Sequence, residues 1–155
     1  MLSGETLSLS DFTGTATENS GEIQVNRYDV IKSIKTYSRP FTVEAEMKSV
    51  GNSECITMSL FATSDGKNND ISLEIGGWAN KWRFFPGDNR GDMGTVTDYR
   101  KVKLVADING AVDYYIDDQL KYTTTSTRAS GYLRFIPGCV SMKITNITVI
   151  EGNVL

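Results

Sequence analysis

The sequence contains no histidine. Because histidine is the commonest general base and zinc ligand near neutral pH, its absence excludes Ser–His and Cys–His catalysis and the usual zinc sites. Positive charge is not in excess either: the net charge is -3, which argues against a nucleic-acid partner. No apolar run approaches the roughly 20 residues of a membrane-spanning helix, and residues 1–10 show no signal-peptide pattern. We therefore expect no membrane partner. The sequence is equally consistent with a fragment of a larger protein.

Cysteine and proline are scarce. The two cysteines, Cys55 and Cys139, leave their pairing open, although the lack of a closely spaced cysteine pattern favours free, mostly buried thiols over a disulfide. Three prolines and 14 glycines are typical of an all-β protein with many turns. With 155 residues the chain has the size of one domain and can bury a substantial core. We expect a single domain over residues 1–155.

Alternation of apolar and polar residues is the main structural signal. In Phe41–Lys48 every second residue is apolar, which predicts a strand with one buried face. The alternation recurs, with turn residues in between, at 55–62, 71–75, 81–85, 102–106, 112–116, 133–135 and 140–149. It slips by one residue near Thr145–Asn146, which predicts a β-bulge. Short strands at this spacing, without a helical period, indicate an all-β sandwich or barrel.

Residues 98–122 carry the clearest local signal. Two alternating segments flank Asn109–Gly110, and Asn-Gly is the strongest short hairpin signal because both residues of that turn take positive φ. A further turn is predicted at Asp117–Asp118, before a third strand. The segment therefore predicts three consecutive antiparallel strands.

This block resembles the penultimate hairpin of the concanavalin A-like lectin and glucanase superfamily. The segments Phe41–Lys48, Gly131–Phe135 and Val140–Val149 are similar to strands in corresponding places of those proteins. The resemblance implies a two-sheet antiparallel jelly-roll sandwich with its N- and C-terminal strands close together. It also implies a function that involves sugars, although the fold by itself does not fix the activity.

Side chains suited to sugar binding gather in residues 74–83. A pyranose has an apolar C–H face and a rim of hydroxyl groups, so an indole beside amide and guanidinium groups matches it. Trp78 follows two glycines in a predicted turn, where we expect it to be exposed and to stack on a sugar, with Asn80 and Arg83 on the hydroxyls. The alternative is a loop tryptophan folded over the end of the sandwich, with Arg83 as an ordinary strand residue. The next candidates for ligand contacts are Arg90, Tyr99 and Tyr132.

The expected function is non-catalytic glycan recognition by an attachment or targeting domain of a larger protein or oligomer, such as a viral spike, at the virion surface or outside the cell. A protein-binding or structural β-sandwich is the alternative. A third hypothesis is a glycoside hydrolase that uses Asp70 and Glu74, because this strand resembles the Glu-x-Asp-x-Glu strand of laminarinase-like glucanases. Aspartate in the first position and Ser72 in the second break that pattern. We therefore expect that the chain is not an enzyme.

Three further motifs allow additional functional interpretations. Arg90-Gly91-Asp92, expected in an exposed loop, is the tripeptide that integrins bind, although Gly-Asp is also common turn chemistry. Asn146–Thr148 fits the N-glycosylation pattern but lies in a predicted strand. Oxygen ligands for Ca²⁺ cluster in one segment, although the same residue types are ordinary in turns; they are Asp65, Asn68, Asn69 and Asp70. No other metal or cofactor is expected.

Overall fold

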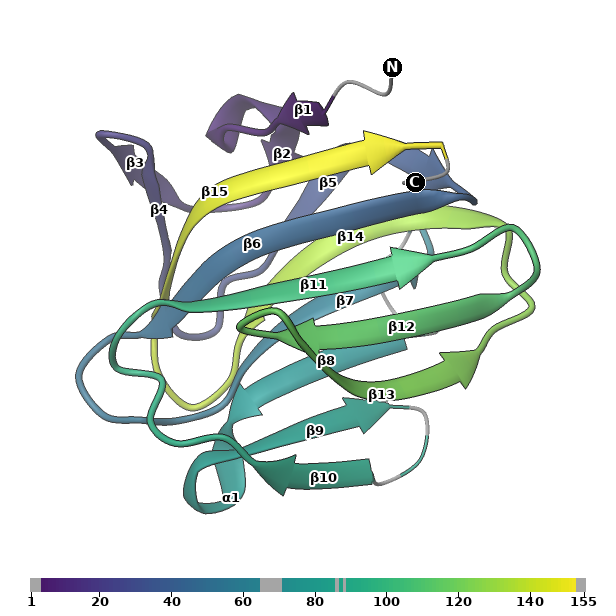
Figure 1. The fold of residues 1–155 in the computed structure, drawn as a ribbon. Coiled ribbons are helices and arrows are strands. Elements are labelled where there is room, and N and C mark those ends of the chain that lie inside the picture. Colours follow the sequence, from purple (N-terminus) through teal and green to yellow (C-terminus); the bar gives the residue numbers. More distant parts are fainter. Residues whose placement is uncertain (1–3, 65–70, 86, 88, 153–155) are drawn as a thin grey trace.

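The computed structural model describes residues 4–64, 71–85, 87 and 89–152. Over these residues the chain forms two antiparallel sheets packed face to face (Figure 1). One sheet contains, in spatial order, β13 (Gln119–Thr125), β12 (Ala111–Ile116), β11 (Arg100–Ala106), β6 (Phe41–Ser49), β15 (Met142–Glu151), β4 (Glu22–Val25) and β3 (Thr17–Asn19), with β1 (Gly4–Thr6) also paired to β15. The other contains β10 (Asn89–Asp92), β9 (Lys81–Phe85), β8 (Ile71–Gly76), β7 (Ile56–Ala62), β14 (Ser130–Pro137), β5 (Ile31–Ser38) and β2 (Phe12–Thr13).

These two sheets, of eight and seven strands, confirm the predicted all-β jelly-roll sandwich. Helical structure in the described residues is limited to the short turns η1 (Leu9–Asp11) and α1 (Gly77–Asn80), and neither is long enough to cross a membrane. β7 to β10 are consecutive neighbours in the seven-stranded sheet, and β11 to β13 in the eight-stranded sheet. β1 pairs with β15, so strands near the two ends of the chain are adjacent, as the resemblance implied. The inner faces of the two sheets pack against each other, and each sheet has one outer face.

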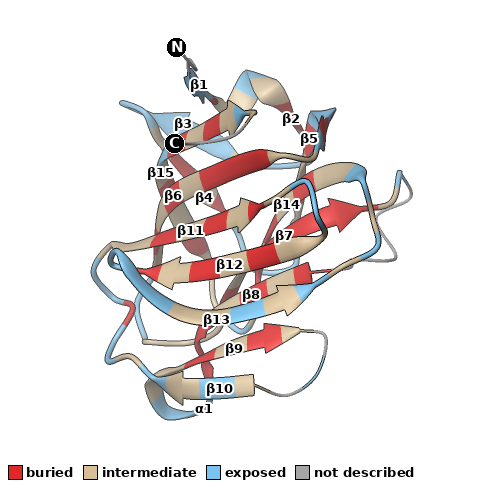
Figure 2. Cartoon of the chain, turned by 45° about the vertical axis from the view of Figure 1, so that its right-hand side comes forward, coloured by how far each residue is buried: buried red, intermediate tan, exposed pale blue. Residues whose placement is uncertain are grey.

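The core lies between the two sheets. The predicted apolar faces point inward, and residues such as Val43 and Leu104 are almost completely buried. Buried positions recur along strands of both sheets (Figure 2). Trp82 and Phe84 both pack against Tyr114 across the sheets, with ring centres 5.7 and 5.5 Å apart. Trp82 is therefore a core residue, which leaves Trp78 as the exposed indole of the chain.

The predicted bulge in β15 is present. β15 pairs with β6 up to Thr145 and resumes at Thr148 with a shift in register. Asn146 takes a φ of 52° in between, and its exposed side chain donates a hydrogen bond to the Glu46 carboxylate. The extra residue returns the following apolar side chains, beginning with Ile147, to the core face.

The hairpin between β11 and β12 differs from its prediction. Oδ1 of Asp107 accepts hydrogen bonds from the backbone N–H groups of Asn109, at 2.9 Å, and Ala111, at 2.8 Å. These bonds close a loop over residues 108–110, in which only Gly110 takes a positive φ, of 101°. The expected turn with two positive φ values is therefore wrong, because the Asp107 carboxylate stabilises a longer loop that ends in one left-handed residue.

Replacing Gly110 with valine should lower the free energy of unfolding by about 1 kcal/mol or more, because a β-branched residue resists positive φ. A Cβ at this position would also lie 3.3 Å from the Ser126 carbonyl oxygen. Urea unfolding of the wild type and the variant measures the difference. An unchanged midpoint would contradict the loop conformation.

The two cysteines meet at one end of the sandwich. Their sulfur atoms lie 3.5 Å apart without a bond. Cys55 immediately precedes β7 and Cys139 follows β14, and these two strands are paired through Ile56 and Pro137. Cys55 is half-buried whereas Cys139 is exposed, so the expectation of mostly buried thiols is wrong for Cys139.

Candidate functional site

A row of charged side chains crosses the outer face of the seven-stranded sheet. Glu74 on β8 pairs with Arg83 on β9, and Arg83 pairs with Arg90 on β10. Their strand neighbours Leu73 and Phe84 are buried in the core, so the alternation of a strand directs the charged side chains to the opposite, outer face. The row ends at the edge strand β10, close to the turn α1 that connects β8 and β9.

The turn α1 has a left-handed backbone. The φ angles of Trp78, Ala79 and Asn80 are 52°, 63° and 64°, after 88° at Gly76. The left-handed conformation costs a residue with a side chain about 1–2 kcal/mol, so other contacts must stabilise the turn. Backbone strain of this kind is concentrated at functional sites, and it marks α1 as a candidate.

Contacts with a distant segment hold the turn in place. Ser53 Oγ donates a hydrogen bond to Asn80 Oδ1 at 2.6 Å and accepts one from the Val96 N–H at 3.1 Å. Gly76 is closely packed, since a Cβ there would lie 2.6 Å from the carbonyl oxygen of Glu54. The carboxamide oxygen of Asn80 is thus engaged within the protein, where it fixes the turn.

The turn presents Trp78 on the surface. The side chain is 61% exposed, and the guanidinium carbons of Arg90 and Arg83 lie 4.8 and 5.3 Å from its ring centre. Cations at these distances are attracted to an indole ring. The structure therefore brings together three of the residues that the sequence suggested, Trp78, Arg83 and Arg90, and leaves the indole exposed rather than folded over the sandwich.

Glu74 lies against the base of the same turn. A Cβ on Gly77 would lie 2.8 Å from Glu74 Oε1, so the glycine leaves space for the carboxylate. Burial raises the pKa of Glu74 above its ordinary value of 4.5, and the nearby Arg83 and Arg90 oppose this rise. The carboxyl group therefore keeps its proton to a higher pH than an exposed glutamate does.

Replacing Glu74 with glutamine should raise the melting temperature at neutral pH and change it little in acid. Because its pKa is raised, Glu74 binds its proton more tightly in the folded than in the unfolded state. Below the pKa of the unfolded state, near 4.5, the carboxyl group is protonated in both states and costs no stability. The cost of ionising the buried group grows as the pH rises through the pKa of the folded state, and it is complete above that pKa. Thermal denaturation of both proteins across this pH range measures the difference. An identical pH dependence would contradict the assignment.

Tyr99 and Tyr132 lie away from Trp78. Tyr99 donates a hydrogen bond to Glu22 on β4, and Lys48 Nζ on β6 lies 4.6 Å from its ring centre. Both contacts belong to the eight-stranded sheet. Burial and the bond to Glu22 raise the pKa of Tyr99 well above its ordinary value. Tyr132 on β14 packs against Lys32 of β5 instead, with Nζ 4.3 Å from the ring centre. The residues that the sequence suggested as ligand contacts therefore do not form one site, because Tyr99 and Tyr132 each lie apart from Trp78.

The tripeptide Arg90-Gly91-Asp92 lies on the edge strand β10 and not in the exposed loop that we expected. Asp92 forms an ion pair with Lys81. Gly91 lies against the core residue Trp82, because a Cβ would come within 2.4 Å of Trp82 Nε1. These contacts give Gly91 and Asp92 structural roles within the sheet.

The predicted calcium ligands Asp65, Asn68, Asn69 and Asp70 lie outside the described residues. Within the part of the chain that the structure describes, no group of three or more His, Cys, Asp or Glu side chains could hold a metal ion. Asp70, the suggested catalytic partner of Glu74, is likewise not described. The middle residue of that strand pattern, Ser72, shares a hydrogen bond of 2.8 Å with Ser59.

The sequence matches no protein-family model and no curated protein, but solved structures share its fold. A β-glucanase from Bacillus licheniformis matches with a TM-score of 0.64 and 15% identity, over 98% of this chain and 92% of that chain. A prokaryotic β-1,3-1,4-glucanase (lichenase) derived from a mouse hindgut metagenome matches with a TM-score of 0.68 and 8% identity, over 97% and 98%. The carbohydrate-binding module CBM66 from Bacillus subtilis matches with a TM-score of 0.60 and 18% identity, over 97% and 92%. The fold is the concanavalin A-like jelly roll that the sequence resemblance implied.

These similarities correct one expectation. We expected a chain that is not an enzyme, but glycosyl hydrolases recur among the solved structures with this fold. That expectation is wrong, because hydrolases and a carbohydrate-binding module share the same sandwich. The three structures described above give no support to a viral spike or to host attachment. At 8–18% identity they establish the fold and not the activity.

Proposed function

We propose that the domain binds carbohydrate at the turn α1 and on the adjoining outer face of the seven-stranded sheet. Trp78 offers a ring face to the apolar side of a pyranose, and Arg83 and Arg90 donate hydrogen bonds to its hydroxyl groups. Glu74 accepts hydrogen bonds from hydroxyl groups when ionised and can donate one when protonated. The similarity in fold to glucanases and to a carbohydrate-binding module supports carbohydrate as the ligand.

The presentation of Trp78 is the observation that carries this proposal. Three consecutive residues with side chains adopt a left-handed backbone, and the result is a large apolar ring that is 61% exposed. The other tryptophan, Trp82, is buried in the core, whereas the strained turn holds the ring of Trp78 at the surface. An exposed indole flanked by hydrogen-bond donors has the composition of a sugar-binding platform.

Replacing Trp78 with alanine should abolish carbohydrate binding and change the melting temperature by only a few degrees. A single shallow site binds in the high-micromolar to millimolar range, about -4 to -6 kcal/mol, so the loss of ring stacking takes binding below detection. A glycan array identifies the ligand, and calorimetric titration measures its affinity.

Tyr28→Ala is the matched control, because Tyr28 is also exposed, at 82%, and lies in a different loop. If Trp78→Ala unfolds the domain, the indole is structural and the proposal fails. Unchanged binding in a folded variant would place the site elsewhere.

Glycoside hydrolysis is a second candidate function, and Glu74 is the observation that favours it. The general acid of a glycoside hydrolase is a carboxyl group that stays protonated near the working pH, and burial raises the pKa of Glu74 in that direction. Release of reducing ends from β-1,3-1,4-glucan and from laminarin tests this function. Glu74→Gln, which keeps the shape of the side chain but cannot act as an acid, should then abolish the release. Binding without release from either polysaccharide would rule this candidate out.

A further inference from the structure

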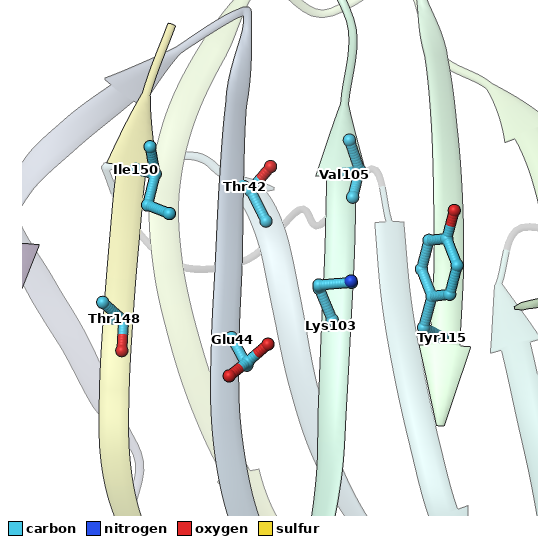
Figure 3. A pocket seen from close by; sticks show the side chains of 7 residues that line it. All are labelled: Thr42, Glu44, Lys103, Val105, Tyr115, Thr148 and Ile150. Atoms are coloured by element: carbon cyan, nitrogen blue, oxygen red, sulfur yellow. The ribbon is translucent and has the colours of Figure 1, made fainter. Parts of the chain in front are cut away.

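A depression of about 390 Å³ lies on the outer face of the eight-stranded sheet, away from the sheet that carries the Trp78 site. Two adjacent rungs of paired side chains on β15, β6, β11 and β12 form it (Figure 3). One rung consists of Ile150, Thr42 and Val105. The other contains Glu44, Lys103 and Tyr115. A volume of this size is within the range of small-molecule sites.

Thr42, between the two apolar side chains of the first rung, has an unused hydroxyl group. Only 7% of its surface is exposed, and its hydroxyl group forms no hydrogen bond to any residue in the described part of the chain. Figure 3 shows this side chain between Ile150 and Val105, in the lining of the depression. The oxygen is not among the enclosed polar atoms of the described residues that lack a partner, so it opens into the depression and can bond to water there. A ligand hydroxyl group seated in the depression would take the place of that water.

The second rung places opposite charges beside this hydroxyl group. Glu44 and Lys103 are paired positions on β6 and β11, yet the ion pair of Glu44 is a long one, 3.9 Å from Lys101 Nζ. Lys103 Nζ lies 4.4 Å from the ring centre of Tyr115. The carboxylate only accepts hydrogen bonds and the ammonium group only donates them. Lys101 is itself paired with Asp118 at 2.8 Å. The charges of Glu44 and Lys103 therefore balance, and the rim suits a neutral ligand with many hydroxyl groups better than an anion or a cation.

We propose that this depression is a second carbohydrate site, which takes one neutral pyranose ring. Val105 and Ile150 contact the C–H face of the ring, Glu44 and Thr42 accept hydrogen bonds from its hydroxyl groups, and Lys103 donates one. The choice of carbohydrate as the ligand rests on the proposed function, whereas the site itself rests on Thr42 and the depression. Because the two sites are on the outer faces of opposite sheets, one domain bridges two polysaccharide chains, and two weak sites reinforce each other.

An NMR titration of the ¹⁵N-labelled chain distinguishes the two sites. The titrants are glucose, galactose, xylose and a β-1,3-1,4-glucan tetrasaccharide, each at millimolar concentration. We expect shifts in the backbone amides of Thr42, Lys103 and Tyr115, together with a separate response of the Trp78 indole. Thr42→Val removes the hydroxyl group at nearly constant shape. It should weaken binding on this face roughly fivefold or more, without lowering the melting temperature, and should leave the Trp78 response unchanged.

Each outcome decides between the two sites. Shifts confined to Trp78 overturn the second site and leave the proposed function intact. Shifts confined to the face around Thr42 overturn the proposed site at Trp78 and support this one. No shift with any titrant overturns both. Unchanged binding in Thr42→Val also overturns the second site, and Tyr115→Ala is the variant to use if Thr42→Val does not fold. Tyr28→Ala should leave both responses as they are.

Discussion

Replacing Gly76 with alanine should lower the free energy of unfolding by about 3 kcal/mol. Gly76 takes a φ of 88°, and a Cβ there would lie 2.3 Å from Val96 Cγ2 and 2.6 Å from the Glu54 carbonyl oxygen. The valine methyl group can move aside, but the carbonyl oxygen belongs to the backbone that supports the turn α1. The variant therefore combines a strained φ with a steric clash. Carbohydrate binding should weaken as well, because the displaced turn carries Trp78.

Gly51 provides the matched control for this substitution. Its φ is also 88°, but nothing lies within 4 Å of the position that a Cβ would take. Gly51→Ala should therefore cost only the conformational part, about 1 kcal/mol. Urea unfolding of the wild type and both variants measures the two costs. Equal costs for the two alanine variants would contradict the close packing beneath α1.

The sandwich could be predicted because the alternation of a strand is a local property. In Phe41–Lys48 each second side chain enters the core, and no knowledge of the partner strand is needed to assign the faces. The bulge near Thr145–Asn146 could be predicted for the same reason, because one extra residue leaves a visible slip in the pattern. The pairing of these strands followed from the resemblance to a known fold and not from the alternation.

The turn conformations could not be predicted from the local sequence. Asn109–Gly110 has the composition of one turn, but a carboxylate two residues earlier, on Asp107, selects another. The left-handed α1 depends on Ser53, which lies 27 positions from its partner Asn80. A serine in a loop carries no signal for such a contact. Sequence reasoning therefore missed Ser53.

For side chains on the outer faces, the sequence likewise indicated the residue type but not the spatial neighbours. Tyr99 has the residue type of a ligand contact, but the chain crosses to the other sheet before reaching it, so it meets Glu22 instead of Trp78. Thr42 occupies the polar face of its strand, and alternation alone predicts that it is exposed. Its burial comes from the side chains of the neighbouring strands β15 and β11. Sequence reasoning missed Thr42 because neither neighbour adjoins it in the chain.

Oxidised glutathione should join Cys55 and Cys139 in a disulfide and raise the free energy of unfolding by about 3–4 kcal/mol. The two sulfur atoms are 3.5 Å apart in the fold, while the residues are 84 positions apart in the chain, so the bond closes a long loop and restricts the unfolded state. The two thiols lose two electrons and two protons, and the glutathione disulfide takes them up to give two thiols. The exposed Cys139 is the sulfur that the reagent can reach.

The mass of the intact protein should fall by two hydrogen atoms, and the melting temperature should rise until a phosphine reductant is added. Burial and the hydrogen bond with Cys139 raise the pKa of the Cys55 thiol to about 11, so ring closure should be slow at neutral pH and faster in mild alkali. Cys139→Ser cannot form the bond and should melt at the same temperature with and without reductant. Cys55 also lies directly beneath α1, since a Cβ on Gly77 would be 3.1 Å from Cys55 Cβ. The disulfide would therefore anchor the segment that supports Trp78. An unchanged mass after oxidation in alkali would contradict this prediction, because it would show that the two sulfur atoms cannot reach bonding distance.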